Sequence, residues 1–196
     1  MKCHQKTPSL IKSEDCKMLL KASIRSPNPV IFLENELMYS QEFEITNQDF
    51  YNAEAVLPIG KAKIMRKGEH VTLVSFSRMV GVCEQAAEQL AKEGISAEVI
   101  NLRTIKPLDR ETIINSVMKT GRLVAVEDGY PTSGVTAEIL STVIESPAFD
   151  YLDAPPQRVT SWDVPMPYAQ SLEMLTTPSA EQIAKAARKT LKGVKL

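Results

Sequence analysis

The sequence predicts an α/β domain built around a mostly parallel β-sheet. The prediction rests on residues 97–134, in which two short apolar runs, 99–102 and 123–126, flank a segment with helical periodicity. Both runs show little alternation of polar and apolar side chains, which is typical of strands buried on two faces. Asp109 suits the N-cap of the helix between them, and Gly121 suits its C-terminal end. Two strands joined by one helix form a right-handed βαβ unit, in which the strands run parallel.

A helix and a strand are predicted before this unit. Ser13 suits the N-cap of a helix that ends near Ile24, with the apolar residues 18–20 on its inner face. A strand over 30–33 follows, and residues 40–57 are polar and poorly periodic, as in a linker. A lone helix and strand do not bury both their faces, so we expect exposed apolar surface here.

The other elements lie on both sides of the βαβ unit. They are a strand at 62–65, a central strand at 70–77, a helix at 78–92, a helix at 135–145, a strand at Val159, an extended loop at 162–168 and a final helix. The final helix is opened either by Thr177 with Pro178 at its first position, or by Ser179 with Gln182 as a capping box. The pattern therefore predicts several strands and helices that bury one another.

Composition narrows the classes of partner. The net charge of -1 gives no reason to expect nucleic acid or an anionic membrane, and the 43% hydrophobic content is ample for a core. Cys3, Cys16 and Cys83 lack metal-type spacing, which indicates a reduced compartment, and Cys83 is interpreted as a core residue. The two histidines, His4 and His70, do not favour a histidine-rich metal site.

Three long motifs carry a family resemblance. VINLRTIKPLD, VMKTGRLVAVEDG and LDAPPQRVTSWDVPMPYA resemble the C-terminal half of the β subunits of the pyruvate dehydrogenase E1 component. These subunits belong to the transketolase-like, thiamine diphosphate-dependent family, and the resemblance runs from about Ser13 to about Leu191. It implies a three-layer α/β/α, transketolase C-terminal-like domain over 58–196, a linker over 40–57 and a remnant of the pyrimidine-binding domain over 1–39.

The resemblance also implies a function. Enzymes of this type decarboxylate pyruvate on thiamine diphosphate and transfer the acetyl group to lipoyl groups. The family's cofactor glutamate and active-site histidine lie in the N-terminal half of a longer subunit, so no catalytic or cofactor-binding residue is expected in this chain, which alone should be inactive. The expected partners are the E1 α subunit, a second β subunit and the subunit-binding domain of the dihydrolipoyl acyltransferase. The expected location is the mitochondrial matrix or, alternatively, the bacterial cytoplasm.

Three other interpretations stay open at this point. The β subunit of the branched-chain 2-oxo acid dehydrogenase has the same organisation, although LENELMY and FDYLDAP favour the pyruvate type. A truncated copy would act as a non-catalytic interaction module. A free-standing flavodoxin-like binding domain would explain the α/β pattern alone.

One candidate metal site follows from the resemblance. It consists of Ser23, Ile24, Ser26 and Asn28, in a loop that helps to hold a structural potassium ion in the resembled subunits. Main-chain carbonyls suit this ion. The family usually has Asp at the position of Ser26, and the loss of that carboxylate would weaken the site. The other interpretation is an ordinary helix C-terminus whose carbonyls face water.

Three acidic residues are candidates for contacts with partners. Glu34 and Glu36 alternate, so they would share one face of a strand, and we interpret them as interface residues rather than as metal ligands. The resemblance implies that Asp153 contacts the basic subunit-binding domain. Turn chemistry is the other interpretation of Asp153, and the favoured one for Asp163, which lies in a proline-rich loop.

A further group lies where open α/β sheets bind ligands. Glu127, Asp128 and Gly129 follow a buried strand, and Gly134 precedes a helix N-terminus, which is a place for phosphate. No GxGxxG motif or P-loop lysine accompanies them, and two acids stand nearby, so we do not predict a nucleotide or flavin site. We expect the glycines to let the loop pack against a neighbouring subunit.

Overall fold

The computed structural model describes residues 7–8, 13–39, 42, 45 and 48–192, so Cys3, His4 and most of 40–47 lie outside the described residues. The helices are α1 Ser13–Ile24, α2 Met79–Ala91, α3 Arg110–Thr120, α4 Val135–Ile144, α5 Gln170–Thr176 and α6 Ala180–Thr190. The 3-10 helices are η1 Glu36–Met38, η2 Gln48–Tyr51 and η3 Pro147–Tyr151. The strands are β1 Thr7–Pro8, β2 Lys63–Arg66, β3 Val71–Ser75, β4 Ala97–Asn101, β5 Thr104–Lys106, β6 Leu123–Val126 and β7 Gln157–Val159.

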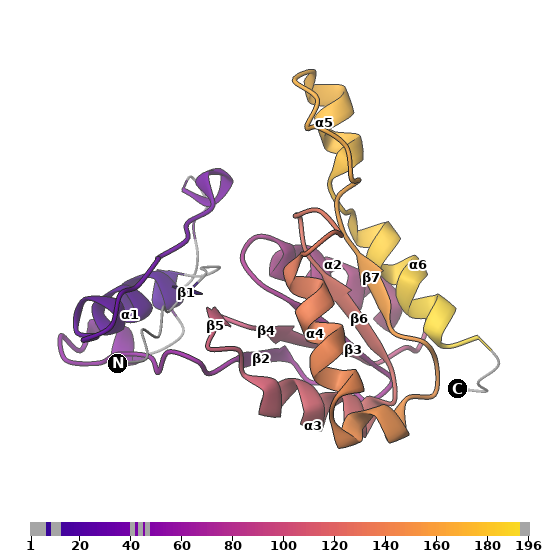
Figure 1. Cartoon of the computed structure of the whole chain (residues 1–196), viewed down its shortest axis with the longest axis horizontal. Helices are drawn as coiled ribbons and strands as arrows, with labels where there is room; N and C mark the ends of the chain where they lie inside the picture. The colour runs from indigo at the N-terminus through magenta and orange to yellow at the C-terminus, as the bar shows by residue number, and fades with distance from the viewer. Residues whose placement is uncertain (1–6, 9–12, 40–41, 43–44, 46–47, 193–196) are drawn as a thin grey trace.

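The main sheet has five strands in the order β2-β4-β3-β6-β7 (Figure 1). β4, β3, β6 and β7 run parallel to one another, and β2 pairs antiparallel with β4. The prediction of a central strand at 70–77 is confirmed by β3, which lies between the two strands of the predicted βαβ unit. β4 and β6 are therefore parallel, as predicted, but each of them pairs with β3 rather than with the other.

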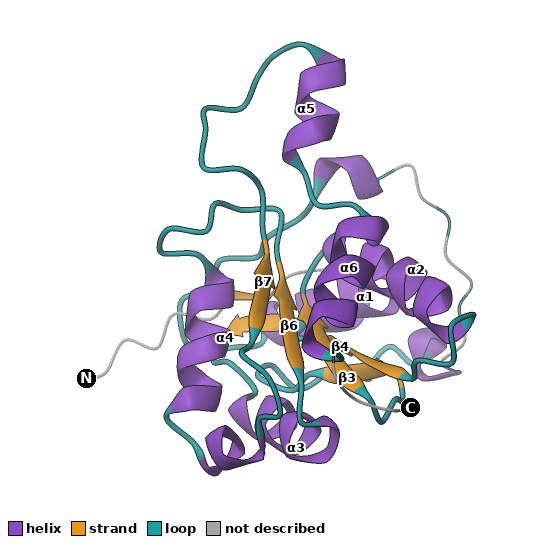
Figure 2. Cartoon of the chain, turned by 90° about the vertical axis from the view of Figure 1, so that its right-hand side faces the viewer, coloured by secondary structure: helices purple, strands orange, loops and turns teal. Residues whose placement is uncertain are grey.

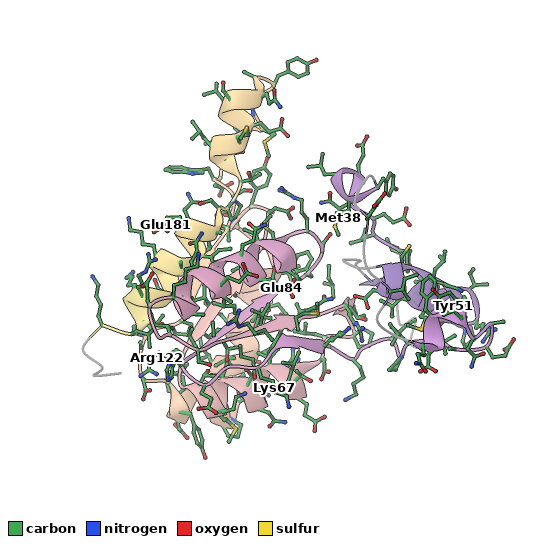
Figure 3. The ribbon with its side chains drawn as sticks, turned by 180° about the vertical axis from the view of Figure 1, so that it is seen from behind. Met38, Tyr51, Lys67, Glu84, Arg122 and Glu181 are labelled. Carbon is green, nitrogen blue, oxygen red and sulfur yellow. The ribbon has the colours of Figure 1, made fainter. Side chains whose placement is uncertain are left out.

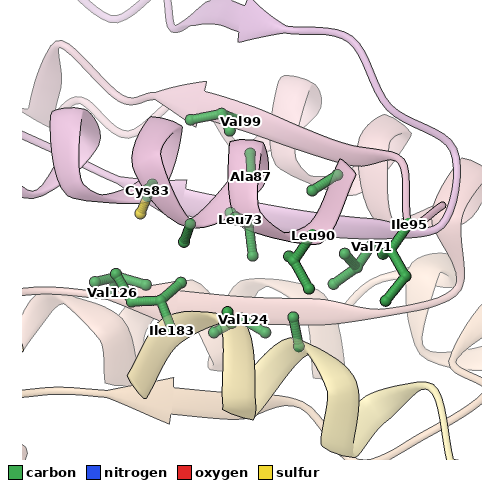
Figure 4. Packing of buried hydrophobic residues seen from close by; sticks show 14 of the residues in the cluster. Val71, Leu73, Cys83, Ala87, Leu90, Ile95, Val99, Val124, Val126 and Ile183 are labelled. Carbon is green, nitrogen blue, oxygen red and sulfur yellow. The ribbon is translucent and has the colours of Figure 1, made fainter. Parts of the chain in front are cut away.

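Helices cover both faces of this sheet, which confirms the three-layer α/β/α prediction. Figure 2 shows α2 and α6 on one face, and α3 and α4 on the other. Neighbouring strand residues alternate between the two layers: Leu73 and Val124 face α2 and α6, whereas Val74 and Ala125 face α3 and α4. Figure 4 shows the first of these cores in close-up. Every residue of β3, β4 and β6 is buried, and this explains why their sequences do not alternate.

Local chemistry sets the ends of the helices. Asp109 caps α3 as predicted, and Gly121 ends it with φ +67°. The final helix uses the Ser179–Gln182 capping box, which decides between the two predicted openings. The Asp109 carboxylate also accepts from the Ala62 amide at 2.9 Å, so it joins α3 to the start of β2. Burial alone would raise the pKa of Asp109, but hydrogen bonds from Ala62 and Thr112 outweigh it and lower this pKa.

One glycine is required by close backbone packing. A Cβ atom on Gly68 would lie 2.1 Å from the carbonyl carbon of Ala97 and 2.2 Å from the amide nitrogen of Glu98. Both of these atoms belong to the backbone of β4, so they do not move aside as a flexible side chain would. The turn between β2 and β3 therefore lies directly against the start of β4.

The N-terminal lobe, which we define as residues 13–39 and 48–54, is held differently. Its helix α1 confirms the prediction, and Met18 and Leu19 are buried as expected, but Leu20 is half-exposed. Lys17 donates to the carbonyl of Phe50 at 2.7 Å, and Lys21 donates to the carbonyl of Ala53 at 2.8 Å. Figure 3 shows this lobe, with Tyr51, beside the domain rather than on the sheet. The described end of the predicted linker thus packs on α1.

One local prediction was wrong, and one helix was missed. The strand over 30–33 is reduced to isolated bridge residues at Val30 and Leu33, because an apolar run forms a strand only where another strand pairs with it along its length. The sequence also gave no sign of α5, which follows the proline-rich loop. Residues 162–176, which we call the arm, project from the sheet (Figures 1 and 2).

Candidate functional site

The carboxyl end of β6 is closed by the chain's own carboxylate. Glu127 accepts hydrogen bonds from the amides of Val135 at 2.9 Å and Thr136 at 3.1 Å, both in the first turn of α4. The Thr136 hydroxyl donates to the same carboxylate. A Cβ on Gly134 would lie 2.2 Å from the Glu127 carboxylate, so glycine is needed to admit it. The positive end of α4 thus already holds an anion from within the chain.

The loop after Glu127 is also tied down within the chain. The Ser161 hydroxyl donates to the carbonyl of Asp128 at 2.9 Å, and the Ser161 amide donates to the carbonyl of Gly129 at 3.1 Å. Asp128 forms an ion pair with Arg78, with 3.6 Å between its oxygen and the guanidinium nitrogen. These bonds join the carboxyl ends of β3, β6 and β7. Packing of the loop against a neighbouring subunit stays a prediction.

Asp153 lies at the surface, as the docking prediction requires, but it has a partner inside the chain. Its side chain is 57% exposed and lies 2.7 Å from the guanidinium of Arg122, which is only 10% exposed. Arg122 also donates to the carbonyls of Thr190, His70 and Thr120. Asp153 is therefore the exposed end of a buried hydrogen-bond network around Arg122 (labelled in Figure 3).

Asp163 makes a long-range structural bond rather than the local turn contact that the sequence analysis favoured. Its carboxylate accepts a hydrogen bond from the Thr132 hydroxyl at 2.8 Å, which joins the arm to the loop before α4. Cys83 is fully buried in the core between α2 and the sheet, as predicted, and burial raises the pKa of its thiol to about 12. This cysteine is packing, not chemistry.

The predicted arrangement of Glu34 and Glu36 on one strand face was wrong. Glu34 lies in a loop and Glu36 opens η1, whose first turn is capped by the side chain of Asn35. Glu34 accepts a hydrogen bond from the Tyr39 hydroxyl at 2.8 Å, and this bond raises the pKa of that hydroxyl. Both glutamates are exposed, so a role in contacts with another chain stays a prediction.

The predicted metal loop lies at the C-terminal end of α1. The Ser23 hydroxyl donates to the carbonyl of Leu19 at 2.7 Å, and the Ser23 carbonyl accepts from the Ser26 amide at 3.1 Å. The Ser26 hydroxyl accepts from the Asn28 amide at 3.3 Å. The loop offers only neutral oxygens, which suit a potassium ion, but its hydroxyls are already engaged in its own hydrogen bonds. Any ion here would depend on carbonyls, as the serine at position 26 predicts.

Three functional candidates were missed by the sequence analysis. Asp15 of α1, Asn101 at the end of β4 and Arg103 just after it meet in a buried polar cluster. The cluster joins residues more than 80 positions apart, so no local pattern predicts it. A single signal was present: the polar side chains of Asn101 and Arg103 interrupt an otherwise apolar strand end.

The arm carries a second unpredicted feature, an apolar groove of about 530 Å³. Its lining includes Trp162, Val164, Leu172 and Leu175. Tyr168, in the loop before α5, is fully exposed, and Met174 and Leu175 are largely so. Exposed apolar surface of this kind marks sites of protein contact.

Among the described residues, no group of His, Cys, Asp or Glu side chains is arranged to hold a metal ion. In that same part of the chain, no helix is both long enough and apolar enough to span a membrane.

Comparison with known families identifies the domain. Residues 60–183 match the model of the transketolase C-terminal domain. The chain belongs to the transketolase C-terminal domain family. The match covers all five strands of the main sheet and the helices α2–α5, so the fold predicted from the motifs is confirmed.

Two curated relatives of this chain carry the name of the same subunit. This chain is 56% identical over 177 residues to "Pyruvate dehydrogenase E1 component subunit beta-1, mitochondrial" of Arabidopsis thaliana. The match covers 90% of this chain and 48% of the relative. The chain is also 56% identical over 179 residues to the mitochondrial pyruvate dehydrogenase E1 β subunit of Bos taurus, covering 91% of this chain and 50% of the relative. The chain thus spans about half the length of these relatives, and the resemblance seen in the motifs is confirmed.

A solved structure supports the fold over nearly the whole chain. It is described as a split-gene transketolase in an inactive β4 tetramer, with a TM-score of 0.78 and 23% sequence identity. The likeness covers 96% of this chain and 58% of that one. It therefore extends beyond the transketolase C-terminal domain into the N-terminal lobe.

Proposed function

We propose that this chain is the C-terminal part of a β subunit of the pyruvate dehydrogenase E1 component. The whole enzyme decarboxylates pyruvate on thiamine diphosphate and transfers the acetyl group to lipoyl groups of the acyltransferase. The observation that carries the proposal is the 56% identity, over 90% of the chain, to subunits with this name. The same relatives favour the pyruvate enzyme over the branched-chain enzyme, and their names place them in mitochondria, which supports the mitochondrial matrix as location.

In this proposal the chain supplies surfaces for assembly rather than catalytic groups. Thiamine diphosphate belongs to the full enzyme, and we assign no cofactor ligand to the described residues. The N-terminus of α4, which follows β6 at the ligand-binding edge of the sheet, is occupied by the carboxylate of Glu127. The proposed partners are the E1 α subunit and a second β subunit, and the exposed apolar arm supports such contacts. The loop of Ser23, Ile24, Ser26 and Asn28 would offer carbonyls to a potassium ion.

The proposed dock for the acyltransferase is the surface around Asp153. A basic subunit-binding domain is steered by exposed acids, and Asp153 is more than half exposed. The ion pair with Arg122 offsets part of the Asp153 charge, but it also holds the carboxylate in one position at the surface. A carboxylate that is already held in place loses less conformational entropy when it binds a partner.

A chimera tests the proposed function. The C-terminal half of the Arabidopsis thaliana subunit would be replaced by this chain and co-expressed with its α subunit. We expect an assembled enzyme that releases CO₂ from pyruvate. The matched control carries the C-terminal half of a branched-chain β subunit instead and should not assemble with that α subunit. A chimera that fails to assemble, while the unmodified subunits do, would overturn the proposal.

The same assembly tests the dock. Asp153→Asn removes the charge and keeps the size of the side chain, and Asp163→Asn is the matched control, because Asp163 is held by Thr132. We expect Asp153→Asn to weaken binding of the isolated subunit-binding domain by about ten-fold, as for a close charge pair across an interface. Asp163→Asn should change binding by less than about two-fold. Surface plasmon resonance measures this affinity. An affinity that changes neither with Asp153→Asn nor with salt would place the dock elsewhere.

A further inference from the structure

The N-terminal lobe meets the α/β domain through an unusual junction. Met18 and Leu19 are buried in the lobe, yet neither belongs to the two core clusters of the domain. Met38 does pack against the first core cluster, and β1 pairs with β5. The centre of the junction is polar, because α1 presents the carboxylate of Asp15 to the end of β4.

The geometry of this centre is specific. One Asp15 oxygen accepts a hydrogen bond from the Asn101 amide group at 3.0 Å, and the other lies 2.7 Å from a guanidinium nitrogen of Arg103. The Asn101 side chain also accepts from the Arg103 backbone amide at 3.0 Å. Asn101 therefore bridges both partners. Asp15 is 1% exposed and Arg103 9% exposed, so water screens their charges poorly.

The backbone adds a second observation. Arg103 has φ +55°, a left-handed conformation that few non-glycine residues adopt. This conformation follows β4 directly and turns the chain at the point where the guanidinium meets Asp15. A strained backbone persists where the surrounding contacts fix it. Here one contact comes from the Asn101 side chain at the end of β4, and the other comes from Asp15 of the N-terminal lobe.

The cluster is also incompletely satisfied. Within the part of the chain that the structure describes, the Asp15 oxygen nearest Arg103 receives no hydrogen bond of good geometry, so its contact is an ion pair alone. The buried Arg103 Nε likewise has no hydrogen-bond partner among those residues. A partly satisfied network of buried charges is costly, so it stabilises the closed arrangement less than a complete one would. The arrangement is that of a contact that can open, not of a permanent core.

We propose that Asp15, Asn101 and Arg103 form a latch that fixes the N-terminal lobe against the carboxyl end of β4. The three are positioning residues: they set where α1 and the loop after it lie relative to the sheet. The latch follows from these contacts alone and does not depend on the reaction that the chain serves. Opening it frees the lobe while the α/β domain stays folded, because neither core cluster contains a latch residue.

Hydrogen exchange on the full chain tests the latch. Asn101→Asp keeps the shape of the side chain but turns its donor toward Asp15 into an acceptor, so two carboxylates face each other. We expect exchange of the amides at 18–24 to accelerate by at least about ten-fold, since breaking a buried charge contact is strongly destabilising. Exchange at 123–126, in β6, is the internal reference and should change by less than about two-fold.

Exchanging the two groups supplies the rescue. In the double variant Asp15→Asn with Asn101→Asp, the amide on α1 donates to the carboxylate on β4, and Arg103 keeps an acid beside it. Protection at 18–24 should return to within about three-fold of the original chain, which a merely structural defect at Asn101 would not allow. Arg25→Gln, which removes an exposed ion pair just after the same helix, is the matched control and should leave exchange almost unchanged.

Two outcomes would overturn the latch. Unchanged exchange at 18–24 in Asn101→Asp would show that the lobe is held by other contacts. Equal acceleration at 18–24 and 123–126 would show that the cluster supports the whole fold rather than the junction.

Discussion

The α/β domain and the N-terminal lobe are each held together internally by a different kind of interaction. In the α/β domain, β3 is buried completely and lies under helices on both faces. In the N-terminal lobe, α1 is joined to residues 48–54 by exposed or half-exposed basic side chains, Lys17, Lys21 and Arg25, that bind carbonyls and one carboxylate. Burial of apolar surface holds the first part, and polar bonds near water hold much of the second.

This difference has a physical consequence. Apolar burial is not weakened by Debye screening, whereas interactions between exposed charges are screened over a Debye length of about 8 Å at 0.15 M salt. Exposed ion pairs contribute about 0–1 kcal/mol each, and one large buried side chain contributes about 1.5–3 kcal/mol. We therefore expect the domain to set the global stability and the lobe to respond to local changes.

The largest expected effect is a break inside the domain. Gly68→Ala would press a Cβ against the backbone of Ala97 and Glu98 and should lower the free energy of unfolding by about 3 kcal/mol. Urea denaturation measures it. The matched control is Gly81→Ala in α2, where a Cβ meets nothing within 4 Å and should stabilise by about 0.5–1 kcal/mol. Equal effects of the two substitutions would refute the close packing of this turn.

A middle effect tests polar chemistry inside the domain. Asp109→Ala removes the N-cap of α3 and should cost about 1 kcal/mol at pH 7. The folded-state pKa of Asp109 is lowered, so its contribution is present above the unfolded pKa of about 3.9 and is lost as the pH falls through the lower folded value. The urea midpoints of Asp109→Ala and of the original chain should therefore differ less at pH 3 than at pH 7. A constant difference would contradict the role of the charged carboxylate.

The smallest expected effect lies in the lobe. Lys21→Ala removes the hydrogen bonds to the carbonyls of Asn52 and Ala53, and it should cost less than about 0.5 kcal/mol globally. Its effect should appear instead as faster proteolysis at 48–54. In the original chain, 1 M salt screens the exposed Arg25–Glu54 ion pair and should change cleavage in the same direction. Lys185→Ala, on α6 of the domain, is the control and should not alter cleavage there. Cleavage that is insensitive to both changes would mean that burial also holds the lobe.

The predictability of the fold follows the same division. The strands at 97–101 and 123–126 were predicted because strands buried on both faces lack alternation, and the caps of α3 and α6 are local motifs. The failed strand at 30–33 has equally apolar residues, but a strand needs a partner, and a partner is not a local property. The order of β3 between β4 and β6 is equally non-local.

The candidate sites show the same limit. The exposure of Asp153 was predicted from its motif, whereas its ion pair with Arg122, 31 positions earlier, could not be read from spacing. The Asp15–Arg103 pair is separated by even more chain. The arm was missed because its prolines indicated a loop, and its short helix α5 buries little of its own surface. Long-range polar pairs are the part of a site that a single sequence hides most completely.

The two edge strands of the main sheet bear on solubility. β2 has an irregular register between Ile64 and Arg66, as at a β-bulge, and carries charged residues at both ends. β7 has only three residues and follows Pro155 and Pro156. A bulge, edge charges and a very short strand each hinder the addition of a foreign strand. Even with an apolar arm exposed, molecules of this protein should resist the edge-to-edge pairing of their sheets that leads to fibrils.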